Sequence, residues 1–157
     1  MNLYLAIKLL HILSATILFG TGLGTAFFMY QAYRSGNIEA MRVTTSHVVM
    51  ADWIFTTPAI VVQLLTGLWL TLHLGISVAS AWFMIVIGLF ALIGACWLPV
   101  VWIQIKVRNM LRDSATVSDI RKLMTAWVLL GLPAFLSVIV LFALMVYKPW
   151  MNRLIIG

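Results

Sequence analysis

Two ionisable residues stand three positions apart in the first long apolar stretch of the chain. At that spacing Lys8 and His11 share one face of a helix, and the residues around them are mostly leucine, isoleucine and alanine. An ionisable side chain in hydrocarbon costs about 2.5–3.5 kcal/mol, so it usually faces a bundle interior and has a partner. The pair therefore predicts a functional site. The structural alternative is that Lys8 extends to the nearby surface and His11 bonds to a neighbouring helix.

A second apolar stretch also carries polar residues at helical spacing, within a sector of roughly 100°. Its members are Asp52, Thr56, Ala59, Gln63, Thr66, Leu70 and His73. In hydrocarbon each polar group needs a partner, and the rest of the chain offers few. We therefore expect the two polar faces to meet. The residues expected at that meeting place are Lys8, His11, Gln63, Thr66 and His73.

This meeting place is predicted to hold a haem. Histidine nitrogens are common iron ligands in haem proteins, and bundle cores hold cofactors between facing helices. We predict His11 and His73 as the metal ligands, Lys8 as a point charge for a propionate, and Gln63 and Thr66 as further cofactor-binding residues. At 1.5 Å per residue His11 lies about 12 Å along its helix, whereas His73 lies about one turn from the end of its own. Joint ligation of one iron thus needs shifted helix boundaries or a different second ligand.

Composition determines the class of protein that positions these residues. Of the 157 residues, 64% are hydrophobic and 9% are charged, which leaves too little polar surface to cover a soluble globule. Four apolar stretches reach the length of about 20 residues that a membrane span requires. They predict an all-α membrane protein, a single four-transmembrane-helix bundle over residues 1–157. The expected helices are 3–33, 51–74, 81–107 and 123–147, and residues 34–50 are expected to form a loop with a short surface helix.

Other patterns limit the remaining possibilities. The net charge of +6 comes from basic residues that flank apolar spans, so we expect no nucleic-acid partner. The single cysteine, Cys96, permits no CxxC motif, and no P-loop or HExxH motif is present. Gly20 and Gly24 form a GxxxG pair, which predicts close contact with another helix. The expected partners are the lipid bilayer and either a membrane partner protein or further copies of the chain.

The distribution of Lys and Arg predicts the orientation. The first and third loops carry seven of these residues: Arg34, Arg42, Lys106, Arg108, Arg112, Arg121 and Lys122. The opposite side carries three: Lys8, Lys148 and Arg153. Because cytoplasmic loops are enriched in Lys and Arg, the first and third loops are predicted to be cytoplasmic. Both termini would then lie on the periplasmic side of a bacterial inner membrane.

Several runs of residues resemble known families. The runs 2–11, 51–58, 66–70 and 96–99, with Gln63 and Gln104, resemble the domain-of-unknown-function family 2269 of predicted bacterial inner-membrane proteins. That likeness covers nearly the whole chain. More distantly, 5–11, 20–23 and 66–70 are similar to HemJ-type protoporphyrinogen IX oxidases and to the copper-resistance CopD membrane domain. The HemJ likeness implies haem b and a functional histidine at His11 beside Lys8.

Two functions of different classes follow from these patterns. The first is a haem b-binding membrane redox protein, which as an enzyme would be a haem-dependent oxidoreductase acting on a porphyrin or a quinone or passing electrons. The alternative is a non-enzymatic small membrane protein that transports a metal or small solute along the polar face, or that assists assembly of a membrane complex.

Overall fold

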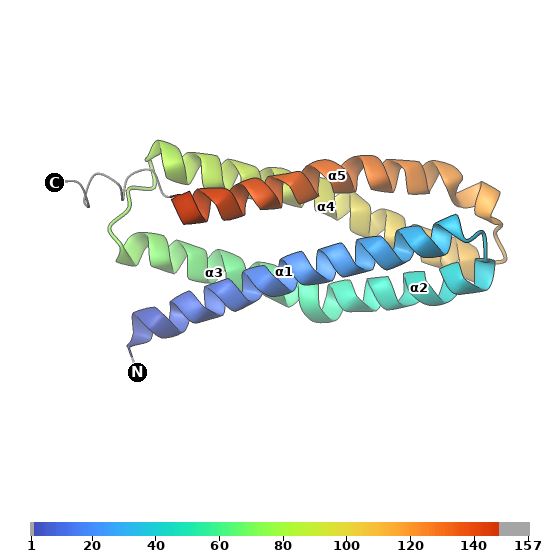
Figure 1. The fold of residues 1–157 in the computed structure, drawn as a ribbon, viewed down its shortest axis with the longest axis horizontal. Coiled ribbons are helices and arrows are strands. Elements are labelled where there is room, and N and C mark those ends of the chain that lie inside the picture. Colours follow the sequence, from blue (N-terminus) through green and yellow to red (C-terminus); the bar gives the residue numbers. More distant parts are fainter. Residues whose placement is uncertain (1, 148–157) are drawn as a thin grey trace.

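Four helical crossings run back and forth along one axis in the computed structural model, which describes residues 2–147 (Figure 1). The elements are α1 (Leu3–Arg34), α2 (Ile38–Ala51), the π-helical turn η1 (Asp52–Thr56), α3 (Thr57–His73), α4 (Ala81–Arg112) and α5 (Val117–Tyr147). The second crossing is continuous from α2 through η1 to α3, and each of the four is long and apolar enough to cross a membrane. The predicted all-α, four-transmembrane-helix bundle is therefore confirmed.

Three boundaries differ from those expected. The second crossing begins at Ile38 and not near residue 51, so the expected loop over 34–50 is wrong. Asn37 caps this start, because its side-chain oxygen accepts from the backbone N–H groups of Glu39 and Ala40. Likewise α4 continues to Arg112 and α5 starts at Val117. Charged residues stay helical here because these helix ends lie near the end of the bundle, where polar side chains meet water and headgroups.

The buried core lies toward the end of the bundle that holds the α1–α2 and α4–α5 turns. It combines residues of four helices: Met29, Met41, Val48, Val100, Ile103, Val107, Leu111, Ile120, Met124 and Trp127. Within this end, α2 packs against α1 and α4. The Arg42 side chain also donates from Nε to the carbonyl oxygen of Leu111 at 3.1 Å, which ties α2 to the last turn of α4.

A π turn divides the second crossing at its middle. Pro58 has no backbone N–H, so a regular helix would leave a carbonyl one turn earlier without its donor. In η1 the helix widens instead, and the N–H of Thr57 bonds to the carbonyl oxygen of Asp52 five residues back. Beyond this turn, α3 packs mainly on α1.

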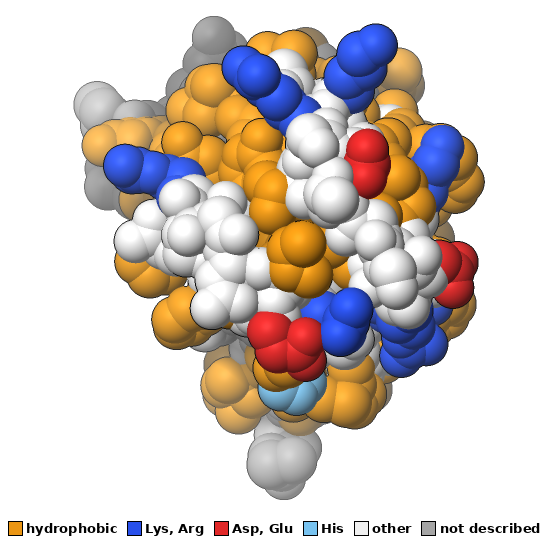
Figure 2. All heavy atoms as spheres, turned by 90° about the vertical axis from the view of Figure 1, so that its right-hand side faces the viewer, with side chains coloured by type: hydrophobic (Ala, Val, Ile, Leu, Met, Phe, Trp, Pro, Cys, Tyr) orange, Lys and Arg blue, Asp and Glu red, His pale blue; other side chains and the backbone are white. Residues whose placement is uncertain are grey.

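The outer surface matches a lipid environment along the helices and an aqueous one at the end. Large apolar side chains such as Leu65, Leu98 and Leu129 are exposed on the helix flanks. Lys and Arg side chains surround the end that holds the α1–α2 and α4–α5 turns (Figure 2). The chain therefore has the surface of a bundle that spans a bilayer with one strongly basic end.

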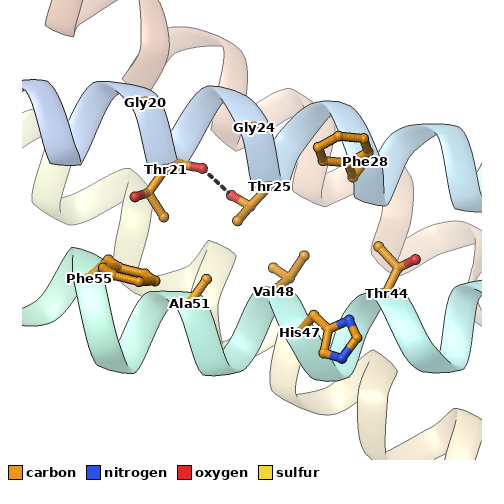
Figure 3. A pocket seen from close by; sticks show the side chains of 10 residues that line it. All are labelled: Gly20, Thr21, Gly24, Thr25, Phe28, Thr44, His47, Val48, Ala51 and Phe55. Atoms are coloured by element: carbon orange, nitrogen blue, oxygen red, sulfur yellow. Dashed lines mark hydrogen bonds between the residues drawn. The ribbon is translucent and has the colours of Figure 1, made fainter.

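Gly20 and Gly24 do not make the close helix contact that was predicted. A Cβ atom built on either glycine would meet no described side chain or neighbouring backbone within 4 Å. Both line a groove of about 490 Å³ between α1 and the α2–η1 segment, where Thr21 and Phe28 face Val48 and Phe55 (Figure 3). The prediction is wrong because bulky neighbours on both helices keep the two backbones apart.

The open space around Gly24 predicts the effect of a substitution there. Gly24→Ala should leave stability unchanged or raise it by about 0.5–1 kcal/mol, because alanine favours a helix interior and has space here. The matched variant Gly36→Ala should lower stability by about 1–2 kcal/mol, because Gly36 has a φ of 67° in the α1–α2 turn. Thermal unfolding of both proteins in detergent measures the difference. Clear destabilisation by Gly24→Ala would restore the close-contact interpretation.

Candidate polar site between α1 and α3

His11 lies on the face of α1 that packs against α3, and both of its ring nitrogens have polar neighbours there. Nδ1 is 2.8 Å from the hydroxyl oxygen of Thr66, and Nε2 is 3.1 Å from the amide nitrogen of Gln63. Ser14, one turn along α1, donates its hydroxyl to the amide oxygen of Gln63. The predicted meeting of the two polar faces is confirmed for His11, Gln63 and Thr66.

The partners determine where the hydrogen of the neutral imidazole sits. The Thr66 hydroxyl donates to the carbonyl oxygen of Val62 at 2.6 Å, so toward His11 it accepts. The Nδ1 atom of His11 must therefore carry the hydrogen. The Gln63 amide nitrogen can only donate, so the Nε2 atom of His11 accepts from it. The neutral ring is thus satisfied at both nitrogens, which is what a polar group in hydrocarbon requires.

Gly67 provides the space for this ring. A Cβ atom at Gly67 would lie 3.1 Å from Cε1 of His11 and 3.7 Å from Nδ1. Gly67 thus permits a close contact of a different kind from the helix–helix contact expected at Gly20 and Gly24, because here a side chain packs on a helix backbone. Its position directly after Thr66 keeps the imidazole against the α3 backbone and within reach of the Thr66 hydroxyl.

His73 and Lys8 lie apart from His11. The exposed His73 ring stacks on Trp69 at a centroid distance of 4.5 Å and on Tyr4 at 5.6 Å. Lys8 is also exposed, with its Nζ atom 5.8 Å from the centre of the Tyr4 ring. His73 follows Thr66 by seven residues, which places it about 10 Å further along α3. The structure brings His11, Gln63 and Thr66 together, and leaves Lys8 and His73 in a second group near the end of the bundle.

This geometry does not fit haem ligation by the predicted pair. His11 and His73 belong to groups about two turns apart along the bundle, so joint ligation of one iron would require their side chains to move from the positions described above. Each ring nitrogen of His11 already has a hydrogen-bonding partner, so a bond to iron would displace Thr66 or Gln63.

Two residues of the polar region were not selected from the sequence. Ser14 is buried and joins the His11 network, and its position three residues after His11 was the available signal. Asp52 is buried in η1, where Oδ1 accepts from the Thr56 hydroxyl at 2.9 Å. Asp52 had been placed on the polar face of the second span but not among the site residues. His47, by contrast, is exposed and lines the groove between α1 and α2.

These features define a class: a four-crossing integral membrane protein with a polar network buried between its first and second crossings. The chain belongs to the family DUF2269, described as a predicted integral membrane protein, which its residues 5–149 match. The family assignment made from the sequence is therefore confirmed. No curated protein and no solved structure matches the chain.

Two threonines of α3 offer a matched test of the network. Thr66 and Thr71 are both buried, and each donates to a carbonyl oxygen four residues back in its own helix. Only Thr66 also accepts from His11. Thr66→Val should therefore destabilise the protein by roughly 1–2 kcal/mol more than Thr71→Val, because it leaves a buried N–H group without an acceptor. Equal unfolding midpoints for the two variants in detergent would contradict this hydrogen-bond assignment.

Proposed function

We propose that this chain is a non-enzymatic membrane protein that passes protons through His11 along the polar face between α1 and the second crossing. Of the two functions predicted from the sequence, this is the transport function, with the proton as the transported species. The observation that supports this proposal most strongly is the set of polar neighbours around His11, which can hydrogen-bond to the ring in either of two protonation states. A histidine is the side chain whose charge changes most readily near neutral pH.

The two states differ by a rotation of one side chain. In the neutral state Ser14 donates to the Gln63 amide oxygen, and the amide nitrogen donates to Nε2 of His11. In the protonated state both ring nitrogens donate, so the Gln63 amide turns by 180° and presents its oxygen to Nε2. Its nitrogen then donates to the Ser14 hydroxyl. That hydroxyl has its second acceptor in place, the carbonyl oxygen of His11 at 2.9 Å.

Each of the four side chains in this set, His11, Ser14, Gln63 and Thr66, keeps at least one hydrogen-bonding partner in both states. The Thr66 hydroxyl accepts from Nδ1 throughout, because Nδ1 carries a hydrogen in either form. An unpaired charge in hydrocarbon costs about 2.5–3.5 kcal/mol or more, and hydrogen bonds to the charged form offset part of that cost. A proton that arrives at Nε2 forms one N–H bond, and its departure breaks the same bond. No other reactant is consumed.

Other ionisable groups lie on either side of His11 along the polar face. Toward the end of the bundle where α1 begins and α3 ends are Lys8, Tyr4 and His73. Toward the middle is Asp52, which lies eleven residues before Gln63 in the second crossing, or about 16 Å away along its axis. Ser14, Thr56 and Gln63 supply hydrogen-bonding groups between them. This sequence of groups supports a path from one end of the bundle toward its centre.

Proton flux into proteoliposomes tests the proposal. With a potassium diffusion potential and a pH-sensitive dye inside, the wild-type protein should acidify the vesicles faster than protein-free vesicles do. His11→Ala should abolish that excess flux, and Gln63→Leu should reduce it strongly because the charged ring loses its acceptor. His47→Ala is the matched control and should keep wild-type flux, since its ring lies in the groove outside the network.

Two results would overturn the proposal. One is an unchanged flux in His11→Ala. The other is a Soret band in wild-type protein from haem-replete cells that disappears in His11→Ala, because that result would favour the haem redox function over proton transfer.

We also propose that the basic end of the bundle faces the cytoplasm of a bacterial cell. The described Lys and Arg side chains other than Lys8 gather at that end, where α1–α2 and α4–α5 turn (Figure 2). Lys148 and Arg153, counted on the opposite side, lie outside the described residues. The positive-inside rule supports this orientation, with the α3–α4 turn on the periplasmic side.

Cysteine labelling in intact cells tests the orientation. In a Cys96→Ala background, a cysteine at Ser77 in the α3–α4 turn should react with an impermeant thiol reagent. A cysteine at Ser114 in the α4–α5 turn should react only after the cells are permeabilised. Both serines are exposed, so accessibility of the side chain does not distinguish them. The opposite pattern would reverse the side assignment.

A further inference from the structure

Three buried polar atoms have no hydrogen-bonding partner among residues 2–147. They are Oδ2 of Asp52, Oε1 of Gln104 and Nε1 of Trp127. The three residues are only 5%, 4% and 6% exposed. Buried polar groups in folded proteins nearly always have a partner, so each such atom requires an explanation, and a small bound species is a common one. The requirement is stronger inside a membrane, where lipid supplies no hydrogen bonds.

The α2–α4 register places Asp52 and Gln104 at nearly the same level of the bundle. The bond between Arg42 and Leu111 aligns the antiparallel pair at one end. Ten residues along α2 and η1 from Arg42 lead to Asp52, and ten residues back along α4 from Leu111 lead to Val101. Gln104 is three residues from that position, or about 4.5 Å along the axis.

The α4–α5 register brings Trp127 to the same region. The indole N–H of Trp82 donates to the carbonyl oxygen of Leu144 at 3.2 Å, which aligns this pair near its other end. Seventeen residues onward from Trp82 along α4 is Pro99, and seventeen residues back from Leu144 along α5 is Trp127. Pro99 and Trp127 therefore lie at about the same level of the bundle. The three unsatisfied atoms therefore belong to residues within about 8 Å of one another along the bundle axis.

All three residues lie on the faces that form the buried core. Asp52 follows Val48 by one turn of the inner face of the second crossing, and Gln104 follows Val100 by one turn of α4. Trp127 is itself a core residue of α5. Three helices thus contribute one polar group each at the edge of the apolar cluster, on the side nearer the middle of the membrane.

The kinds of atom indicate the ligand. Asp52 and Gln104 each present an oxygen that accepts hydrogen bonds or binds a hard cation, and Trp127 presents a donor. In the described part of the chain the ion pair is Arg42 with Glu39, so Asp52 has no basic side chain bonded to it there. A carboxylate at this depth requires either a proton or a counter-ion. One carboxylate with neutral oxygens suits a single positive charge better than a divalent ion.

We propose that Asp52 and Gln104 form a binding site for a monovalent cation, a proton or Na⁺, in the core of the bundle. The indole N–H of Trp127 holds a water molecule that completes the hydrogen bonding. Asp52 lies about 16 Å from the His11 level on the same polar face, and cation binding at Asp52 and Gln104 does not require proton transfer at His11. Besides the tyrosines of α1 and the charged residues near the helix ends, the ionisable groups on the surrounding elements are His11 on α1, His47 on α2, His73 on α3, and Cys96 and Lys106 on α4; α5 has none between Lys122 and Tyr147.

Infrared spectroscopy and calorimetry of the purified full chain in nanodiscs test the site. If a proton occupies it, the infrared spectrum should contain the carbonyl band of a buried protonated carboxyl group, and Asp52→Asn should remove that band. If Na⁺ occupies it, titration with NaCl against choline chloride should give a binding heat that Asp52→Asn abolishes. Glu39→Gln is the control, because Glu39 is an exposed carboxylate and should change neither signal.

A second variant separates binding from folding. Gln104→Met keeps the length of the side chain and removes its oxygen, so it should weaken Na⁺ binding or shift the carboxyl band while the helical content stays that of the wild type. A wild-type protein with neither a protonated-carboxyl band assignable to Asp52 nor a Na⁺ binding heat would overturn the proposal. An unchanged band and heat in Gln104→Met would remove Gln104 from the site.

Discussion

The need to satisfy every polar group inside the bilayer is the constraint on which this structure depends. Lipid offers no donor or acceptor, so each polar side chain within a span must find its partner in another part of the protein. His11 meets that requirement with Thr66 and Gln63, and these bonds join α1 to α3 across their shared face. Because apolar side chains gain little from leaving lipid for protein, such polar contacts and close packing determine which helices pair.

The π turn explains how one crossing serves two regions. Ahead of it, α2 packs on α4 within the apolar core, and beyond it, α3 packs on α1 around His11. Asp52 stands at the turn itself, with Thr56 as its partner. The widened turn accommodates Pro58 and also marks the boundary between the core and the polar face. Both proposed sites therefore lie along one continuous helical segment and within different packing environments.

Helical periodicity was sufficient to predict the number of crossings and the pairing of His11 with Gln63 and Thr66. Those predictions rest on spacing within long apolar stretches, where the signal is strongest. The boundaries at Ile38 and Val117 were missed because polar residues are stable in a helix once it leaves the hydrocarbon. Gly20 and Gly24 were misassigned because a GxxxG pattern does not specify which neighbour, if any, approaches it.

Other features depended on contacts between distant parts of the chain. Gln104 lies between two isoleucines and Trp127 between Ala126 and Val128, so neither belongs to a stripe of polar residues that would distinguish it. Only the register of α2, α4 and α5 brings them to the level of Asp52. In the same way, the separation of His73 from His11 follows from where α1 meets α3. A second histidine on the same face indicated proximity, but the rise along the helix places it two turns away.

The central claim is that His11 exchanges a proton while its network stays intact. Nitrogen NMR of histidine- and glutamine-labelled protein in nanodiscs, recorded as a function of pH, measures this directly. The account predicts that the ring nitrogens of His11 change from the neutral form with hydrogen on Nδ1 to the doubly protonated form. The side-chain amide signal of Gln63 should shift over the same pH range. A His11 ring that stays neutral wherever the protein remains folded, with an unchanging Gln63 amide, would contradict the account.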